Sequence, residues 1–200
     1  MAGPQHKKGK STIPVRERLL TVATRLFRSH GYGEIGINQI LKESEVARAS
    51  LYLHFPTKEA LGQAYLKTNS EGQNEQVAGQ IQRYPEPHKF IGAWARILKH
   101  EAKSMGLYGC AIANLRAETP GDHTELHQTI RETAARMVTV IREYIEQGQA
   151  SGQIAAHLDA SVAARRVFVA YEGAMQVWLL TGELESLDDF ADLARGLLVA

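Results

Sequence analysis

The chain has 200 residues, of which 44% are hydrophobic, so it can bury a sizeable core in one domain or two small ones and is not a disordered chain. Its net charge of +1 hides an uneven distribution, because residues 1–67 contain 11 Lys and Arg against 5 Asp and Glu, whereas residues 68–200 contain 12 against 17. The first residues, MAGPQHKKGKST, lack the apolar core of a signal peptide, and charges interrupt the longest apolar stretches. We therefore expect a cytoplasmic protein that does not enter a membrane.

The uneven charge indicates that the two parts of the chain face different partners. A net charge of +6 over the first third suits a polyanion such as DNA, whereas the −5 of the remainder would be repelled by it. On charge alone, a chance imbalance between solvated surfaces is the alternative explanation.

Hydrophobic periodicity predicts helices almost throughout, with no convincing run of alternating strand positions. The first predicted helix begins near Pro14 and ends before Gly31. Its apolar residues follow the spacing of one buried stripe: Val15, Leu19, Val22, Ala23, Leu26 and Phe27. A second, short helix is expected over residues 37–44. A third lies in the segment ARASLYLHF, because Pro56 blocks its continuation, and Thr57 can then cap a long fourth helix.

Three helices within about fifty residues, the second and third short and close together, are typical of a helix-turn-helix fold. Such a fold places its third helix in the major groove of DNA. Arg48 and Ser50 are residue types that reach base edges, and the small Ala49 lets the helix approach closely. Tyr52 and His54 carry polar tips that can meet phosphate oxygens.

Three more residues near this helix have predicted roles in DNA binding. Lys58, near the start of the fourth helix, adds a charge beside backbone N–H groups that favour an anion. Asn38 and Thr57 complete the predicted set of DNA contacts. Phe55, in contrast, is expected in the core, where it would lock the recognition helix to the first helix.

The segment GYGEIGINQILKESEVARASLYLHFPTKEAL, residues 31–61, resembles the DNA-binding signature of TetR-type bacterial transcriptional regulators. Its specific part is the L-Y-x-H-F-x-x-K-E-x-L core, and the similarity extends over roughly residues 15–65. The resemblance implies an all-α fold of about nine helices and a homodimeric repressor that a small effector releases from a double-stranded DNA operator. We assign residues 1–12 to a basic arm, 13–58 to the helix-turn-helix domain and 59–200 to a helical ligand-binding and dimerisation domain.

Two positions depart from the pattern that these regulators share. Glu45 stands where they usually have glycine in the turn before the recognition helix, so a left-handed backbone there would cost up to about 1 kcal/mol. Ile35 and Gly36 stand where Thr or Ser usually caps the second helix. Gly36 can still act as a cap, but it lacks the hydroxyl that would contact a phosphate.

The same segment contains a competing motif, since Gly31-Tyr-Gly33-Glu-Ile-Gly36 fits the GxGxxG pattern of dinucleotide-binding proteins. That pattern needs a preceding strand within a βαβ unit. A helical stripe precedes it here. We therefore interpret these glycines as a helix stop and a turn.

Beyond the fourth helix, the same signals predict five more helices. They are expected over about residues 87–105, around 110–115, through 126–145, and over about 159–180 and 186–199. Asp122 is predicted to cap the long helix that follows it. The total of nine helices is the number that the resemblance implies.

The sequence shows no catalytic or metal-binding pattern, so we expect neither an enzyme nor a cofactor. GxSxG and Walker A motifs do not occur, and His100-Glu101 lacks a second histidine at position 104. His123 and His127 have a spacing found among metal ligands, but they lack a clear third ligand. An all-helical enzyme or small-molecule carrier remains the competing class, and it would have no evident acid, base or nucleophile.

The single cysteine, Cys110, begins a Gly-Cys-x-x-x-Asn pattern over residues 109–114 that resembles a short motif in some branches of the same family. A helix N-terminus lowers the pKa of a thiol, so an alternative function is a repressor that senses oxidants or electrophiles through Cys110. The simpler interpretation is a small buried residue that packs beside glycines. We expect the simpler one.

The acidic part carries large or adaptable apolar residues on several helices, and a few of them are candidates to line the cavity of a small, largely apolar effector. The predicted pocket contains Trp94, Leu98, Met105, Cys110, Asn114, Met137, Tyr144, Phe168, Tyr171 and Met175. For each of these residues, packing in the core is the alternative. The penultimate helix is also apolar nearly all round over residues 167–180, which predicts a homodimer face formed with the final helix.

Overall fold

The computed structural model describes residues 13–104 and 109–198, and within these ranges the chain forms nine α-helices and no strand. The all-α prediction is confirmed. The helices are α1 (Val15–His30), α2 (Ile37–Ser44), α3 (Arg48–His54), α4 (Lys58–Arg83), α5 (Pro87–Ser104), α6 (Ala111–Ala117), α7 (Thr124–Ala150), α8 (Ala160–Thr181) and α9 (Glu185–Leu198). The basic arm at residues 1–12 and Met105 of the predicted pocket lie outside the described residues.

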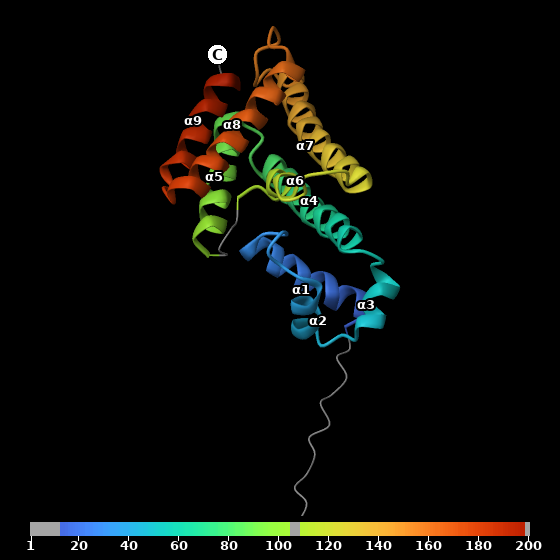
Figure 1. Ribbon diagram of the computed structural model, residues 1–200. Helices are drawn as coiled ribbons and strands as arrows, with labels where there is room; N and C mark the ends of the chain where they lie inside the picture. Colours follow the sequence, from blue (N-terminus) through green and yellow to red (C-terminus); the bar gives the residue numbers. More distant parts are fainter. Residues whose placement is uncertain (1–12, 105–108, 199–200) are drawn as a thin grey trace, which may run out of the picture.

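The helices form a small lower body and a larger upper one (Figure 1). The lower body contains α1, α2 and α3, and the upper body contains α5 to α9. The long helix α4 begins beside α3 and runs up to pack along α7, so it belongs to both bodies. The predicted domain boundary after residue 58 therefore falls at the very start of the helix that the two parts share.

The lower body is held by a compact core in which Leu19 and Leu26 of α1 meet Ile40 of α2 and Leu51 of α3, all at most 1% exposed. Burial of side chains of this size stabilises each helix by about 1.5–3 kcal/mol per residue. Phe55 is also buried, at 3% exposed, as predicted. The short helices α2 and α3 are therefore held by packing rather than by their own length.

Aromatic contacts continue this core from α1 into α4. The ring of Phe27 lies 5.1 Å from Tyr32 and 5.4 Å from Tyr65 of α4, measured between centroids. The α1–α2 turn is pressed so closely onto α4 that a Cβ built at Gly62 would lie 2.9 Å from the Tyr32 ring. A side chain at position 62 would force the turn and α4 apart.

The ends of the first helices follow the sequence signals closely. Gly31 ends α1 with a φ of 87°, and Gly36 is the N-cap of α2, so the glycines of the GxGxxG pattern form a helix stop and a turn. Glu45 takes the left-handed conformation, with φ 52° and ψ 37°, which is the strained arrangement expected where the resembled regulators usually have glycine. The Thr57 hydroxyl accepts a hydrogen bond of 3.0 Å from the Ala60 N–H, as predicted for the cap of α4.

One predicted cap is wrong. Asp122 does not cap α7, because the helix begins at Thr124 and its N-cap is His123, whose side chain makes no capping hydrogen bond. The helix starts one residue later than the sequence signal indicates, and the His123 side chain contacts Glu59 instead of the helix end.

The upper body is built on an aromatic core. Trp94 of α5 contacts Tyr171 of α8 and Phe190 of α9, with centroids 5.5 and 5.0 Å apart, and Phe90 lies 4.5 Å from Tyr144 of α7. All five side chains are at most 4% exposed. Among the described helices, none is both long and apolar enough to cross a membrane.

Candidate nucleic-acid interface and effector region

The recognition helix α3 is attached by one face and exposed on the other. Leu51 is fully buried, whereas Arg48, Ala49 and His54 are exposed and Tyr52 is 41% exposed. On a helix with 3.6 residues per turn, Ala49 lies nearly opposite the buried Leu51 and Tyr52 lies to one side. Arg48 and His54, three residues before and after Leu51, lie closer to its side and are exposed at the two ends of this short helix. Ser50 is half-buried at the edge of this surface, and Thr57 and Asn38 are exposed.

Arg48 is held in place by the neighbouring helix. Its guanidinium donates a hydrogen bond to the side-chain oxygen of Asn38 at the start of α2. On the far side of α2, Glu43 accepts hydrogen bonds from Arg25 of α1 and from Gln39. These contacts cross-link the three helices on their solvent side, so the predicted DNA contacts of α2 and α3 form one surface.

Lys58 points away from open solvent. Its ammonium lies 4.3 Å from the centroid of the Tyr32 ring and donates to the Gly33 carbonyl oxygen at 3.4 Å. Burial lowers the pKa of Lys58, and the Glu118 carboxylate opposes this shift. A phosphate contact therefore requires Lys58 to leave the α1–α2 turn.

Leu53 is an exposed residue that the sequence analysis missed. It is 81% exposed on α3, next to Tyr52. Its position two residues after the buried Leu51 was the available signal, because residues two apart on a helix cannot share a face. An apolar side chain on this surface can contact a thymine methyl group in the major groove.

Two polar contacts join the lower body to the connection between α6 and α7. The Gly33 N–H donates to the Glu118 carboxylate, and His123 Nδ1 lies 2.7 Å from Glu59 Oε1. The partners are 85 and 64 residues apart, so no local pattern in the sequence indicates these contacts. Through these two contacts, a displacement of α6 or of the start of α7 would move the α1–α2 turn and α4.

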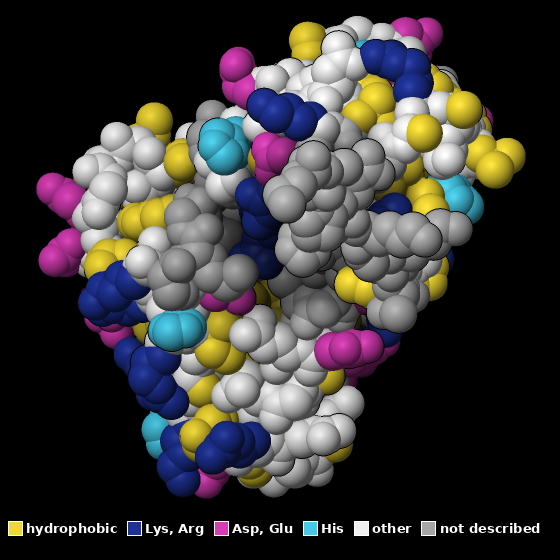
Figure 2. Space-filling model, turned by 90° about the horizontal axis from the view of Figure 1, so that it is seen from below, with side chains coloured by type: hydrophobic (Ala, Val, Ile, Leu, Met, Phe, Trp, Pro, Cys, Tyr) yellow, Lys and Arg dark blue, Asp and Glu magenta, His cyan; other side chains and the backbone are white. Residues whose placement is uncertain are grey.

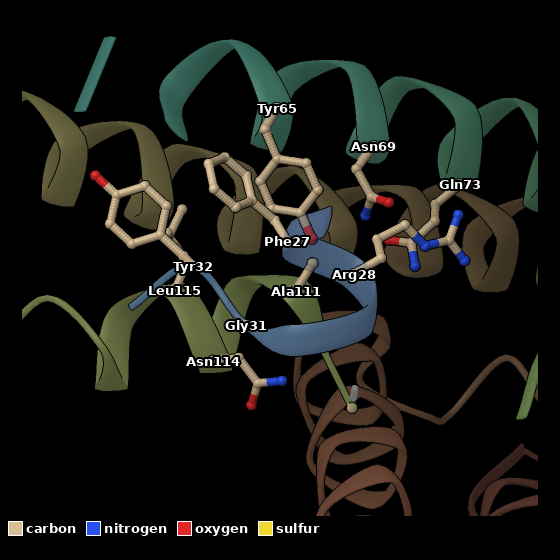
Figure 3. Close-up of a pocket in the computed structure, with 11 residues that line it drawn as sticks. Phe27, Arg28, Gly31, Tyr32, Tyr65, Asn69, Gln73, Ala111, Asn114 and Leu115 are labelled. Carbon is tan, nitrogen blue, oxygen red and sulfur yellow. The ribbon is translucent and has the colours of Figure 1, made fainter. Parts of the chain in front are cut away.

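A small cavity lies at the same junction, between α1, α4 and α6 (Figure 3). Phe27, Tyr32 and Tyr65 form its aromatic side, while Asn69 and Asn114 contribute polar groups. Its volume is about 20 Å³, which is room for a single water molecule. Asn114 is the one residue of the predicted effector pocket that lines this cavity.

Most of the predicted pocket residues lie together in the packed core of the upper body. The rings of Trp94 and Phe168 both stack with Tyr171, with centroids 5.5 and 6.2 Å from it. Tyr144 donates a hydrogen bond of 3.3 Å to the Pro85 carbonyl oxygen. The remaining apolar members are at most 4% exposed: Leu98, Met137 and Met175. The structure therefore brings these side chains into one cluster between α5, α7 and α8.

Comparison with known proteins decides the family. A model of bacterial regulatory proteins of the tetR family matches residues 19–65, and a model of the tetracyclin repressor-like C-terminal domain matches residues 88–194. The chain belongs to the TetR family. It is a DNA-binding transcriptional regulator, as its recognition helix indicates.

Several curated and solved proteins resemble this TetR-family regulator. The HTH-type transcriptional regulator LmrA of Bacillus subtilis is 31% identical over 134 residues, which are 66% of this chain and 71% of LmrA. The repressor DhaR of Mycobacterium sp. strain GP1 is 24% identical, over 88% of both chains. A TetR-family regulator of known structure from Streptomyces coelicolor has a TM-score of 0.79 and 29% identity, covering 92% of this chain and 94% of its own.

Cys110 of this TetR-family chain is buried and paired. Its side chain is 7% exposed, and the thiol donates a hydrogen bond of 3.0 Å to Glu172 Oε1 on α8. Burial and the nearby carboxylate raise the pKa of the Cys110 thiol, although N–H groups at the start of α6 lower it slightly. The expected lowering by the helix N-terminus is therefore outweighed, and the environment is that of a packed residue rather than a reactive thiolate.

The two histidines at the start of α7 have other partners than a metal. His123 contacts Glu59, as above, and His127 Nε2 donates to the Thr119 carbonyl oxygen at 2.8 Å. Within residues 13–104 and 109–198, no group of three His, Cys, Asp or Glu side chains has an arrangement that can hold a metal ion.

Proposed function

We propose that this TetR-family regulator is a homodimeric repressor that binds a pseudo-palindromic operator and is released from it by a small, largely apolar effector. The observation that carries the proposal is the exposed face of α3, with Arg48 held by Asn38 on a basic body. Several similar proteins are named repressors, DhaR and NemR of Escherichia coli among them, which supports repression rather than activation.

The surface of α8 and α9 supports a dimer. Val169, Val177 and Leu180 of α8 are 47 to 74% exposed, and Leu193 of α9 is 58% exposed. Apolar side chains gathered over two adjacent helices are unusual on a monomer and typical of a protein interface. A two-fold dimer formed here would bury the same surface on both subunits and leave both α3 helices free for DNA.

The packed core between α5, α7 and α8 is the proposed effector site. A relative of known structure, FadR of Bacillus subtilis, was solved in complex with stearoyl-CoA; it has a TM-score of 0.73 and 17% identity, and covers 91% of this chain and 97% of its own. This relative supports an apolar effector. In this chain the effector would have to separate Trp94, Phe168 and Tyr171, and that movement would reach the lower body through α4 and through the Glu118 contact with Gly33.

Operator binding is tested first. The protein should shift a palindrome-containing fragment from upstream of its own or a neighbouring gene, and its affinity should fall steeply with salt, because each neutralised phosphate releases counterions. The affinity is measured by fluorescence anisotropy at several salt concentrations. Binding that stays unchanged between low and moderate salt would contradict the proposed interface.

Effector binding can be followed through Trp94, which is buried at 4% exposed. In a Trp178→Phe background, Trp94 is the remaining tryptophan, so its fluorescence reports on the core alone. A long-chain fatty acid or its CoA thioester should change this fluorescence and release the operator over the same concentration range. Release without any change at Trp94 would move the effector site elsewhere.

A redox-gated repressor is the second candidate. The repressor NemR of Escherichia coli has a known crystal structure of a reduced form, and this structure has a TM-score of 0.81 to this chain. The burial of Cys110 opposes it. A chain with one cysteine cannot close an internal disulfide. Oxidation of Cys110 would therefore have to stop at sulfenic acid, form a mixed disulfide with a small thiol or form a disulfide between two subunits. We expect mild peroxide to leave operator binding unchanged in the wild type and in Cys110→Ser. Release in the wild type alone would establish the redox function.

A further inference from the structure

A groove of about 560 Å³ runs between α5 and α9 in the upper body. These two helices pack side by side on the opposite side of the molecule from α3 (Figure 1). The floor of the groove consists of small residues, Gly92, Ala95 and Ala191, of which the two alanines are 4% exposed. Small residues on both helices allow the backbones to approach, so longer side chains form the rims.

Basic side chains dominate the rims. On α5, Arg96, Lys99, His100 and Lys103 are spaced by three, four and seven residues, which places them on one face of the helix. Arg195 faces them from α9. Four Lys and Arg side chains therefore line the groove, against the two carboxylates of Asp188 and Asp192, although the chain beyond residue 67 is acidic overall.

The two carboxylates are already engaged. Lys99 Nζ donates to both oxygens of Asp188, at 2.9 and 2.7 Å, and Arg195 Nη1 donates to Asp192 at 2.8 Å. Arg96 and Lys103, in contrast, make no hydrogen bond or ion pair within the part of the chain that the structure describes. The groove thus keeps an excess of positive charge that its own acids do not neutralise.

The guanidinium groups of Arg96 and Arg195 lie close to each other above Gly92 in the floor of the groove. A Cβ built at Gly92 would lie 3.2 Å from Arg195 Nη2 and 3.6 Å from Arg96 Nη1. The two nitrogens are therefore within about 7 Å of each other, where two positive charges repel unless an anion lies between them. Asp192 holds Nη1 of Arg195 and leaves Nη2 facing Arg96.

We propose that this groove binds a small molecule that carries several phosphate groups. Arg96 and Arg195 would hold one phosphate from two sides, because guanidinium groups donate paired hydrogen bonds to phosphate oxygens. Lys103 lies two helical turns away, about 10 Å along α5, and reaches a second anionic group of the same ligand. This site is separate from the apolar core, and its position away from α3 favours a small ligand over DNA.

The proposal is tested by calorimetric titration of the full chain with inorganic tripolyphosphate, pyrophosphate and orthophosphate at constant ionic strength. Tripolyphosphate should bind in a saturable manner, at least tenfold more tightly than orthophosphate. Arg96→Gln and Lys103→Gln should each weaken it about tenfold, and neither removes a contact that holds the fold. Arg131→Gln on α7, which makes the same charge change outside the groove, should leave binding unchanged. An arm with ATP distinguishes a nucleotide ligand from a chain of phosphates alone.

Two results would overturn the proposal. One is tripolyphosphate binding that is not saturable or that falls equally in Arg131→Gln and Arg96→Gln, because this would report a general effect of charge. The other is weaker binding of non-operator DNA in Arg96→Gln with tripolyphosphate binding unchanged, because this would make the groove a nucleic-acid surface.

Discussion

The first three helices and the last two bury their apolar residues by the same packing rules, but they leave opposite kinds of surface exposed. On α1 to α3, the exposed side chains are mostly charged or polar, and Lys and Arg gather in several groups on the face of the molecule seen from below (Figure 2). On α8 and α9, the exposed side chains include Val169, Val177, Leu180 and Leu193. The first surface suits a polyanion and the second a copy of itself. The comparison shows that the exposed side chains of a helix, rather than its buried ones, determine which partner it binds.

The two interiors differ as well. Where α1, α2 and α3 meet, the core consists of Leu and Ile side chains that are at most 1% exposed, whereas the core between α5, α8 and α9 includes a cluster of aromatic rings around Trp94 and Tyr171. An aliphatic core of this size holds three helices in one arrangement. Stacked rings between long helices can be separated by a ligand that replaces their contacts, which suits the part of the molecule that responds to an effector.

The largest expected effect comes from breaking the lower core. Leu51→Ala should cost about 2–5 kcal/mol of stability, because it leaves a cavity where α3 meets α1, and operator binding should be lost. The matched control is Leu53→Ala on the exposed face of the same helix, which should change stability by less than about 0.5 kcal/mol. Thermal unfolding and operator titration measure both variants. Equal destabilisation by the two changes would contradict the described orientation of α3.

A charge introduced into the exposed apolar surface of α8 tests whether that surface forms the dimer interface. Val177→Asp or Leu180→Asp should give helical monomers whose operator affinity is at least about a hundredfold weaker, since one half-site supplies too few contacts. Leu180→Met keeps the apolar surface and should leave the dimer intact. Sedimentation velocity gives the oligomeric state. An unchanged dimer in both charged variants would place the interface elsewhere.

Substitutions of single basic residues in the lower body should distinguish contacts to bases from contacts to phosphates. Arg48→Ala should cost about 1–3 kcal/mol and relax the preference at one operator position if the arginine is bidentate to guanine. Lys58→Ala should instead weaken binding to all sequences alike and reduce the salt slope by about 1. Binding to a set of operators with single base changes distinguishes the two. A uniform loss in Arg48→Ala would assign Arg48 to the phosphates.

The smallest expected effect is a pH dependence at Glu172. Burial raises the pKa of this carboxyl, so the folded chain holds its proton more tightly than the unfolded chain does. The unfolded chain loses that proton first as the pH rises, and stability is therefore lost above the ordinary pKa of a glutamate. Glu172→Gln keeps an oxygen that can accept from Cys110 and should unfold at a slightly higher temperature than the wild type at pH 7. The two should converge below about pH 4, where both side chains are neutral. An equal difference in unfolding temperature at pH 7 and below about pH 4 would contradict a raised pKa of Glu172.

The helix-turn-helix could be predicted because its signals are local. The apolar stripe of α1, the stop at Gly31, the cap at Thr57 and the burial of Phe55 all depend on residues within a few positions of one another. The left-handed Glu45 was also foreseeable, from the turn that must separate two short helices. The exposure of Ala49 followed from the burial of Leu51 on the other side of α3.

Other features were decided only by the tertiary structure. The N-cap of α7 is His123 rather than the predicted Asp122. Cys110 is buried beside a carboxylate of α8, and burial first and the carboxylate second raise the pKa of its thiol.

The junction of Glu118 with Gly33 and the groove between α5 and α9 bring together residues that are about 85 to 100 positions apart in the chain. Helical periodicity shows which side of each helix is buried, because that depends on a repeat of 3.6 residues. It does not show which helices meet, because the packing of distant segments sets the partners of each buried or charged side chain.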